Sequence, residues 1–211
     1  MILDQRESRH LAKVLRVRVG DEIEIFDGCG KTRRCLVAHV SPHAVELKGG
    51  EVKAKRPASP AFELGVAVPK GKKMDEIVRF VTEMGATRLV PLVTARSEGS
   101  TDAGRWDAKC QKWSLTAIEA CKQSGNAFVP QIGPFATLEN WLRGLGESTF
   151  KMVASLEADA RPLRYWLHDH QSNSPSQVAL LVGPEGDLSS EEYALGRERG
   201  FVPCTLGSTV L

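Results

Sequence analysis

The sequence predicts an α/β domain with a mostly parallel β-sheet, preceded by a small β-barrel domain. Before about residue 57, short alternating segments are separated by turn residues, as in small β-domains. After it, apolar strand-like runs alternate with helical stripes, as in βα units. One run, 178–182, is apolar throughout, as expected for a parallel strand covered on both faces.

The first domain is predicted at 1–56, with strand candidates at 22–26, 34–38 and 44–48. Turn residues, such as those at 27–30, separate these strands. Residues 53–60 are charged, contain two prolines and have no apolar period. A linker is therefore predicted at 57–61, followed by the α/β domain at 62–211.

The elements of the α/β domain are predicted from their apolar periods. Residues 74–84 carry a helical stripe that ends before Gly85, and glycine commonly terminates helices. A short strand at 89–93 contains Pro91, which places it near an edge or at a strand end. The other predicted elements are strands at 62–68, around Val153, at 178–182 and at 201–205, and a long helix at 105–123.

The apolar strand 178–182 leads directly into the turn Gly183-Pro184-Glu185-Gly186. Ser189 and Glu192 then fit the capping box of a helix that ends by Gly200. In open α/β sheets, ligands bind beyond the carboxyl ends of strands, where glycines allow close backbone approach. The turn is thus a candidate ligand-binding loop, and a tight strand–helix connection is the alternative.

A second turn of similar character, at 206–209, follows the last predicted strand. In the first turn, Gly183 and Gly186 remove side chains that would block a flat heterocycle, and Pro184 limits conformational freedom. Two such turns close together could hold a nucleoside between backbone amides.

Composition excludes several classes of protein. With 211 residues and 42% apolar content, the chain can form a sizeable core. No apolar run approaches the ~18 residues of a membrane span, and the charged first ten residues do not resemble a secretory signal. An odd number of scattered cysteines indicates buried thiols in the reducing cytoplasm rather than disulfides or zinc. The cysteines are Cys29, Cys35, Cys110, Cys121 and Cys204.

Charge is distributed unevenly along the chain. Residues 1–80 hold 16 Lys+Arg against 11 Asp+Glu, and the remaining 131 residues hold 12 against 15. A basic N-terminal portion suggests a polyanionic partner, and a solvated charged face is the alternative. The basic residues that could follow a phosphate backbone are Arg6, Arg9, Lys13, Arg16, Arg18, Lys53, Lys55, Arg56, Lys70, Lys72 and Lys73.

Other chemistries lack their motifs. The chain has no G-x-x-x-x-G-K-[ST], no G-x-G-x-x-G after a strand and no G-x-S-x-G. His168 and His170 are expected in a strand or loop. Because no third metal ligand is evident, they are interpreted as surface histidines. No metal site is predicted.

An ordered series of motifs over nearly the whole chain resembles the ribosomal RNA small subunit methyltransferase E (RsmE) family. Each motif is weak alone, and the series in this order is specific. The matching residues are His10-Leu11, Val14-Leu15-Arg16, Val19-Gly20-Asp21, Phe26-Asp27-Gly28, Lys70-Gly71, Met74, Glu83-Met84-Gly85, Pro91, Arg96-Ser97, Trp106, Glu119-Ala120, Gln123-Ser124-Gly125, Gly183-Pro184-Glu185-Gly186 and Leu206-Gly207.

The resemblance implies a PUA-like β-barrel that helps to hold RNA, followed by a SPOUT-type α/β domain with a trefoil knot. It implies binding of S-adenosylmethionine by the knot loops and action as a homodimer. The implied reaction is methylation of N3 of a uridine in 16S ribosomal RNA within the assembled small subunit.

Residue roles carried over from the resemblance divide into two sets, and no catalytic base is assigned. The expected cofactor-binding residues are Leu156, Glu157, Gly183, Pro184, Glu185, Gly186, Leu206, Gly207, Ser208 and Val210. The expected RNA-binding residues are Arg16, Lys70, Lys72 and Arg96. Glu119 and Gln123, at i and i+4 of one predicted helix, face either the substrate or a dimer mate, or are simply solvated.

The chain departs from the family pattern in two places. Asn126 stands where the family usually has arginine, and Ser208 and Thr209 stand near its usual proline and arginine. The family also continues beyond Leu211 into a segment that completes the knot, so the α/β domain is expected to be incomplete at this end. Two rival hypotheses follow: a non-catalytic ribosome- or RNA-binding module, and a SPOUT methyltransferase that acts on another RNA.

Overall fold

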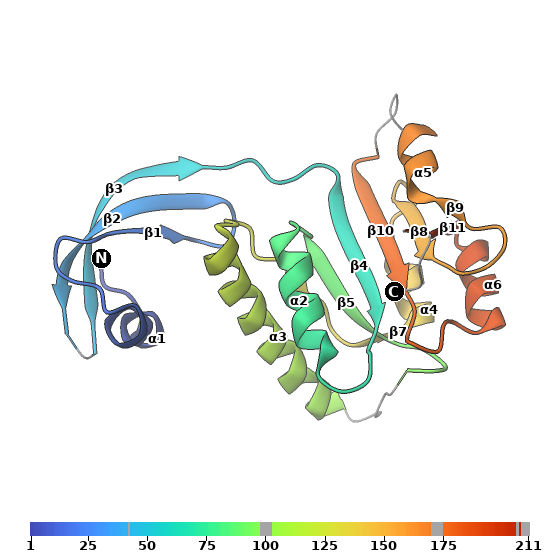
Figure 1. Ribbon diagram of the computed structural model, residues 1–211, viewed down its shortest axis with the longest axis horizontal. Helices are drawn as coiled ribbons and strands as arrows, with labels where there is room; N and C mark the ends of the chain where they lie inside the picture. The colour runs from blue at the N-terminus through green and yellow to red at the C-terminus, as the bar shows by residue number, and fades with distance from the viewer. Residues whose placement is uncertain (42, 98–102, 170–174, 206, 208–211) are drawn as a thin grey trace. The chain divides into compact units, whose positions relative to one another are not determined.

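The computed structural model describes residues 1–41, 43–97, 103–169, 175–205 and 207 (Figure 1). The chain divides into two compact units, Met1–Pro57 and Ala58–Leu211. No helix among the described residues is long and apolar enough to cross a membrane.

The first unit is an antiparallel sheet with order β1-β2-β3 and one helical segment. The strands are β1 (Glu22–Phe26), β2 (Lys31–Val40) and β3 (Val45–Ala54). They overlap all three predicted strands, and β3 continues into the segment with linker character. Leu11 from the helical segment packs with the core residues Cys35, Val37, Val45 and Leu47.

The helical segment was not predicted. It consists of α1 (Gln5–Arg9) and a π-helical continuation, η1 (His10–Leu15). The Asp4 side chain caps α1 by accepting a hydrogen bond from the backbone N–H of Glu7 at 2.8 Å. An acidic residue at the N-cap is a recognisable start signal, so the sequence did carry evidence for this helix.

The second unit is a three-layer α/β structure. Its eight-stranded sheet has the order β6-β5-β4-β10-β8-β11-β9, with β7 also paired to β5, and every pairing is parallel. The strands are β4 (Ala61–Ala67), β5 (Arg88–Val93), β6 (Gln131–Ile132), β7 (Ala136–Thr137), β8 (Phe150–Ala154), β9 (Arg161–Pro162), β10 (Gln177–Val182) and β11 (Val202–Thr205). The helices are α2 (Lys73–Glu83), α3 (Ala103–Ser124), α4 (Leu138–Gly144), α5 (Leu163–Asp169) and α6 (Ser190–Glu198).

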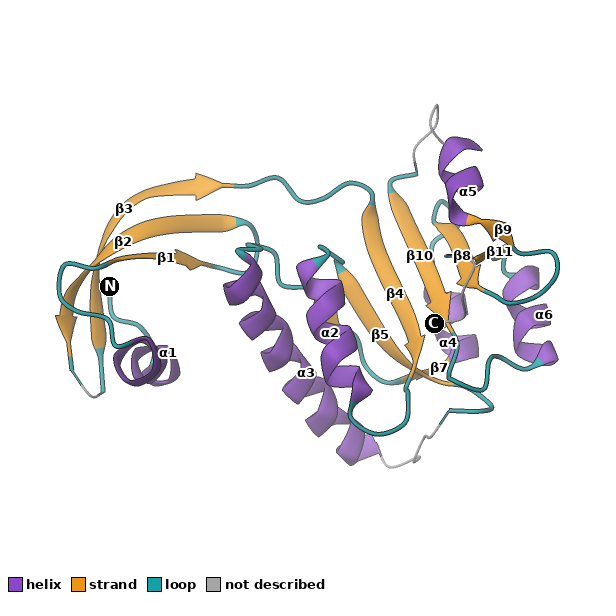
Figure 2. Ribbon diagram, viewed as in Figure 1, coloured by secondary structure: helices purple, strands orange, loops and turns teal. Residues whose placement is uncertain are grey.

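Helices cover both faces of the sheet, as Figure 2 shows. On one face, α2 and α3 pack against β4 and β5 in a core that includes Val66, Val78 and Trp113. On the other face, α4 and α6 pack against β5, β8 and β10 in a core that includes Trp141 and Tyr193. Burial on both faces explains why 178–182 is apolar throughout.

Pro91 lies inside the sheet, although its strand was expected near an edge or a strand end. On its inner side, β5 pairs with β4 along Arg88–Leu92. On its outer side, β5 pairs with β6 at Arg88 and Leu89 and with β7 at Leu92 and Val93. Pro91 falls between these two short outer pairings, where its missing N–H removes no described ladder contact.

Two further points differ from the sequence analysis. Helices α4 and α5 were not predicted, and His168 lies in α5 rather than in a strand or loop. His170 lies outside the described residues. The predicted trefoil knot depends on the chain from Leu206 onward, of which Gly207 alone is described.

Candidate cofactor site

Three strand ends lie side by side at the carboxyl edge of the parallel sheet. Strand β8 lies between β10 and β11, with Leu181 opposite Val153 and Cys204 opposite Ala154. Immediately beyond the strands, the Ser155 N–H donates to the Cys204 carbonyl at 2.9 Å. The loops after β8 and β10 therefore start next to one another and next to the end of β11, as a ligand site in an open α/β sheet requires.

Most of the expected cofactor-binding residues lie in these loops. Those described are Leu156, Glu157, Gly183, Pro184, Glu185, Gly186 and Gly207. Leu206, Ser208 and Val210 lie outside the described residues. Leu156 is 64% exposed directly after a buried strand. An apolar side chain that is exposed at a strand end suits contact with a flat heterocycle.

The loop after β10 is a closed turn. Asp187 has a φ of +63° and donates its N–H to the Pro184 carbonyl at 2.9 Å. Its carboxylate oxygen Oδ1 accepts hydrogen bonds from the Leu188 N–H and from the Tyr193 hydroxyl, both at 2.8 Å. Pro184 and Leu188 are buried beneath the turn. The turn thus has a fixed shape.

Gly183 allows this turn to fold back on itself. A Cβ at Gly183 would lie 3.1 Å from Leu188 Cγ and 3.3 Å from the Leu188 backbone nitrogen. Both distances are tighter than an ordinary van der Waals contact. At Gly186, a Cβ would approach only the Arg96 side chain, at an ordinary 3.6 Å. Gly183 therefore has a packing role, and its expected role beside an adenosine stays a prediction.

Contacts from two other loops hold the same turn in place. Arg96, which follows β5, donates from Nη1 to the Gly186 carbonyl at 2.6 Å. Next to it, the Ala95 N–H donates to Oε1 of Glu192 at 2.7 Å. At the start of α2, Lys73 Nζ lies 3.2 Å from Glu185 Oε1. The turn is therefore connected to the chain after both β4 and β5.

The predicted helix start at Ser189 is confirmed. The Ser189 side chain accepts from the Glu192 N–H, and Glu192 Oε2 accepts from the Ser189 N–H, which forms a complete capping box. Because Oε1 of Glu192 also holds Ala95, one carboxylate joins α6 to the loop after β5. The capping motif predicted the contact of Glu192 with Ser189 but not its contact with Ala95.

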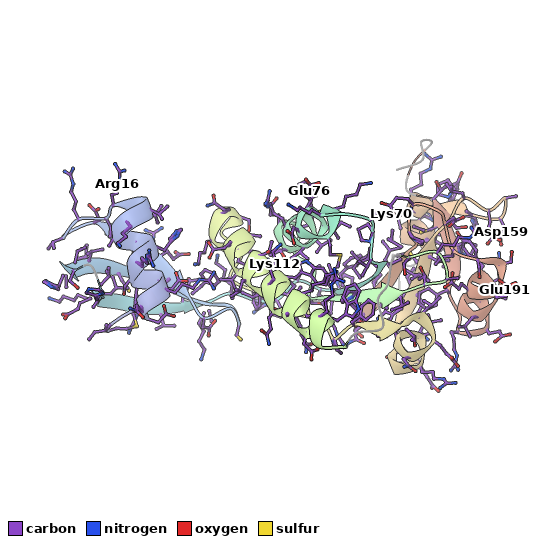
Figure 3. The ribbon with its side chains drawn as sticks, turned by 90° about the horizontal axis from the view of Figure 1, so that it is seen from below. Arg16, Lys70, Glu76, Lys112, Asp159 and Glu191 are labelled. Carbon is purple, nitrogen blue, oxygen red and sulfur yellow. The ribbon has the colours of Figure 1, made fainter. Side chains whose placement is uncertain are left out.

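The loop after β8 is held by α6. Arg197 Nη2 lies 2.5 Å from Glu157 Oε2 and 3.3 Å from Asp159 Oδ2. The backbone is fixed separately, because the Glu157 N–H donates to Ser155 Oγ at 3.0 Å. Figure 3 shows Asp159 beside α6. Sequence reasoning missed Arg197, and no local motif identified it.

The four expected RNA-binding residues fall into two places. Arg96 contacts the turn after β10, while Lys70 and Lys72 lie exposed between β4 and α2. Lys70 also lies close to the site, because its backbone hydrogen bonds with Glu185. Arg16 lies in the first unit, where it ends η1 in the left-handed conformation and is exposed (Figure 3). The sheet edge thus gathers three of the four residues.

Two pKa shifts describe the charge state of the site. Hydrogen bonds from its own backbone N–H and from Lys73 hold the pKa of Glu185 below its usual range. Burial raises the pKa of Tyr193 to about 12. At neutral pH, Glu185 is therefore ionised, and Tyr193 keeps the proton that it donates to Asp187.

Asn126, where the resemblance led us to expect arginine, has a structural role. Its Nδ2 donates to the Thr82 carbonyl at 3.1 Å, and its Oδ1 accepts from the Phe128 N–H at 3.0 Å. Asn126 therefore joins the end of α2 to the chain after α3. Nearby on α3, Glu119 forms an ion pair with Lys122 at 3.0 Å.

One buried hydroxyl at the same sheet edge was not predicted from the sequence. Thr94, directly after β5, is 5% exposed, and its Oγ1 has no hydrogen-bond partner among the described residues. Across all the residues that the structure describes, no three His, Cys, Asp or Glu residues are grouped so that they could hold a metal ion.

Family models match both units of the chain. A model described as an RNA methyltransferase domain matches residues 57–211, and one described as an RNA methyltransferase PUA domain matches residues 3–48. The ribosomal RNA small subunit methyltransferase E of Synechocystis sp. is 29% identical over 99% of this chain and 67% of its own length. The Bacillus subtilis protein of that name is 27% identical over 97% of this chain and 81% of its own.

Solved structures agree with the family models. The Neisseria gonorrhoeae ribosomal RNA small subunit methyltransferase E, crystallised with S-adenosyl methionine, has a TM-score of 0.88 and 28% identity over 100% of this chain and 85% of its own. A Legionella pneumophila methyltransferase with bound SAM has the same values. The resemblance inferred from the ordered motifs is confirmed, and the chain belongs to the RNA methyltransferase family, with a PUA domain followed by an α/β methyltransferase domain.

Proposed function

We propose that this protein transfers a methyl group from S-adenosylmethionine to N3 of a uridine in 16S ribosomal RNA. The observation that carries the proposal is the preformed turn at Gly183–Gly186 beside the exposed Leu156, at the carboxyl edge of the sheet. Family membership and the names of the relatives support ribosomal RNA as the substrate class.

The donor site is built from the three adjacent loops. Leu156 and the backbone of the turn after β10, where Gly183 and Gly186 present no side chain, would hold the adenine ring. Glu157 offers a carboxylate that can accept hydrogen bonds from hydroxyl groups. Leu206, Gly207, Ser208 and Val210 complete the proposed site from the third loop.

The reaction demands positioning more than covalent chemistry from the protein. S-adenosylmethionine supplies an activated methyl group on a sulfonium whose leaving group is a neutral thioether. The protein aligns uridine N3 with that carbon, and such alignment can lower a barrier by up to ~7–11 kcal/mol. Removal of the N3 proton by a positioned group adds roughly 10²–10⁴-fold. The target base leaves its stack to reach the site.

The RNA is held by basic residues near the site and in the PUA domain. Lys70, Lys72 and Arg96 contribute at the sheet edge, and Arg16 contributes from the first unit. Among the described residues, Arg96 donates to the Gly186 and Leu188 carbonyls from Nη1, which leaves its other donors for further contacts. Arginine has five N–H donors, so it can hold the turn and a phosphate at once.

The working form is proposed to be a cytoplasmic homodimer with a trefoil-knotted α/β domain that acts on the assembled small subunit. Phe80 of α2, Met84 at its C-cap and Leu115 of α3 are exposed apolar side chains, which a second copy could cover. Sedimentation of the purified protein at micromolar concentration tests the dimer, and a monomer would contradict it.

Two measurements test the function. Calorimetry with S-adenosylmethionine should show binding, whereas a non-catalytic RNA-binding module would bind none. Mass spectrometry should then detect N3-methyluridine in 16S RNA from wild-type cells and none in cells that lack the gene. If 16S RNA keeps this modification in the deletion strain, a methyltransferase for another RNA becomes the better hypothesis.

A further inference from the structure

We propose that Arg197 is a positioning residue that holds Glu157 in the orientation needed to bind the ribose hydroxyls of the methyl donor. This inference rests on the proposed function, because it takes the loop after β8 as part of the donor site. It adds a residue from α6 that belongs to none of the expected site motifs.

The geometry places Arg197 behind Glu157. Nη2 of Arg197 lies 2.5 Å from Glu157 Oε2 and 3.3 Å from Asp159 Oδ2. The guanidinium therefore bridges two carboxylates that follow β8. Without this charge, Glu157 and Asp159 would repel each other, and the Glu157 side chain would be free to rotate.

The remaining freedom of Glu157 is in its side chain. Its backbone is already fixed, because its N–H bonds Ser155 Oγ and its carbonyl accepts from the Ala160 N–H at 3.0 Å. Arg197 engages Oε2, and among the described residues Oε1 has no hydrogen-bond partner. A carboxylate held by one oxygen presents the other as an acceptor, which suits a vicinal diol.

Arg197 also links the two described loops of the site. Its guanidinium carbon lies 5.9 Å from the ring centroid of Tyr193, one turn earlier on α6. The Tyr193 hydroxyl holds Asp187 in the turn after β10. One face of α6 therefore sets both the fixed turn and the carboxylate that lies across from it.

The Arg197–Glu157 pair is too exposed to contribute much to folding. The two side chains are 42% and 35% exposed, and pairs of this kind add little to stability. Replacement of Arg197 should therefore leave the fold intact. Its effect should appear in the binding of one part of the ligand.

The test is calorimetric binding of S-adenosylhomocysteine and of its 2′,3′-dideoxy analogue to the full chain. For Arg197→Gln we expect the Kd of S-adenosylhomocysteine to rise about tenfold, because a charge-assisted hydrogen bond is misaligned. The Kd of the dideoxy analogue should change less than about twofold, since the analogue lacks the hydroxyls. Arg197→Lys should restore part of the affinity, because lysine keeps the charge but lacks the planar guanidinium that bridges the two carboxylates.

Two further variants make the comparison specific. Glu157→Gln should reproduce the loss for S-adenosylhomocysteine, and combining it with Arg197→Gln should add little. Arg143→Gln removes a matched arginine–carboxylate pair on α4, the one with Glu139, and should change neither affinity. Equal melting temperatures establish that all variants fold.

The outcomes separate the inference from the function it rests on. If Arg197→Gln weakens both ligands equally, or if Glu157→Gln has no effect, the positioning role is wrong while the donor site stands. If the wild-type chain binds neither ligand, the proposed function fails, and this inference fails with it.

Discussion

The loops after β10 and β8 are neighbours at the same sheet edge, yet they are held in different ways. The turn after β10 is fixed by its own hydrogen bonds, by buried Pro184 and Leu188, and by contacts from the chain after β4 and β5. The loop after β8 exposes Leu156, and its Glu157 side chain forms an ion pair with Arg197 of α6.

This difference indicates separate roles for the two loops in the site. The preformed turn after β10 lowers the entropy that a ligand loses on binding. The exposed loop after β8 supplies apolar area and a carboxylate that become buried only when the ligand binds. Changes in the turn after β10 should therefore affect folding and binding together, and changes in the loop after β8 should affect binding alone.

The largest effect is expected for Gly183→Val. The new side chain would meet Leu188, so the turn must shift, and overpacking of this kind costs about 1–3 kcal/mol of stability. Binding of S-adenosylmethionine should weaken by at least about tenfold. Gly144→Val, at the end of α4 and outside the site, is the control, because a Cβ at Gly144 would meet nothing within 4 Å. Normal binding by Gly183→Val would refute the role of the turn.

Leu156→Ala should separate binding from stability. Leu156 is 64% exposed, so the melting temperature should stay within about 1 °C of the wild-type value. Loss of apolar contact with the ligand should raise the Kd of S-adenosylmethionine roughly five- to thirtyfold. Leu36→Ala, at an exposed leucine on β2, serves as control. An unchanged Kd for Leu156→Ala would remove this residue from the site.

Arg96→Gln should affect both the turn and the RNA. Its loss removes the hydrogen bond to the Gly186 carbonyl and one positive charge near the site. Methylation of small-subunit RNA should fall about tenfold, mostly through a higher KM for RNA. The salt dependence of RNA binding should also weaken, by the slope that corresponds to about one phosphate contact. A fall in kcat with unchanged KM would show that Arg96 acts only on the turn.

The smallest effect is expected for the Lys73–Glu185 pair and depends on pH. The pKa of Glu185 is lowered in the folded state from an ordinary 4.5. Its contribution to stability is therefore present above that value and is lost as the pH falls through the folded-state pKa. Lys73→Gln should lower the Tm by less than about 2 °C at pH 7, with the difference shrinking by pH 3. A constant difference at both pH values would exclude the pair as its cause.

Sequence periods were sufficient where an element is long and its signal is local. The strands near 62–68 and 178–182, the helices near 74–84 and 105–123, and the capping box at Ser189 all appear within a few residues of their predicted positions. The turn at 183–186 was recognised for the same reason, because glycine and proline restrict the backbone wherever they occur. Short elements such as β6, β7, β9, α4 and α5 carry too few residues for a period.

Tertiary structure alone decided how the site is assembled. The parallel order places β8 between β10 and β11, which makes the loop that carries Leu156 start next to the turn at Gly183. Arg197 meets Glu157 across 40 positions of sequence, and Glu192 meets Ala95 across 97. Such contacts are set by strand order and helix placement rather than by neighbouring residues. The sequence by itself therefore determined the elements and the turn, and the packing of α6 against the sheet determined which side chains support them.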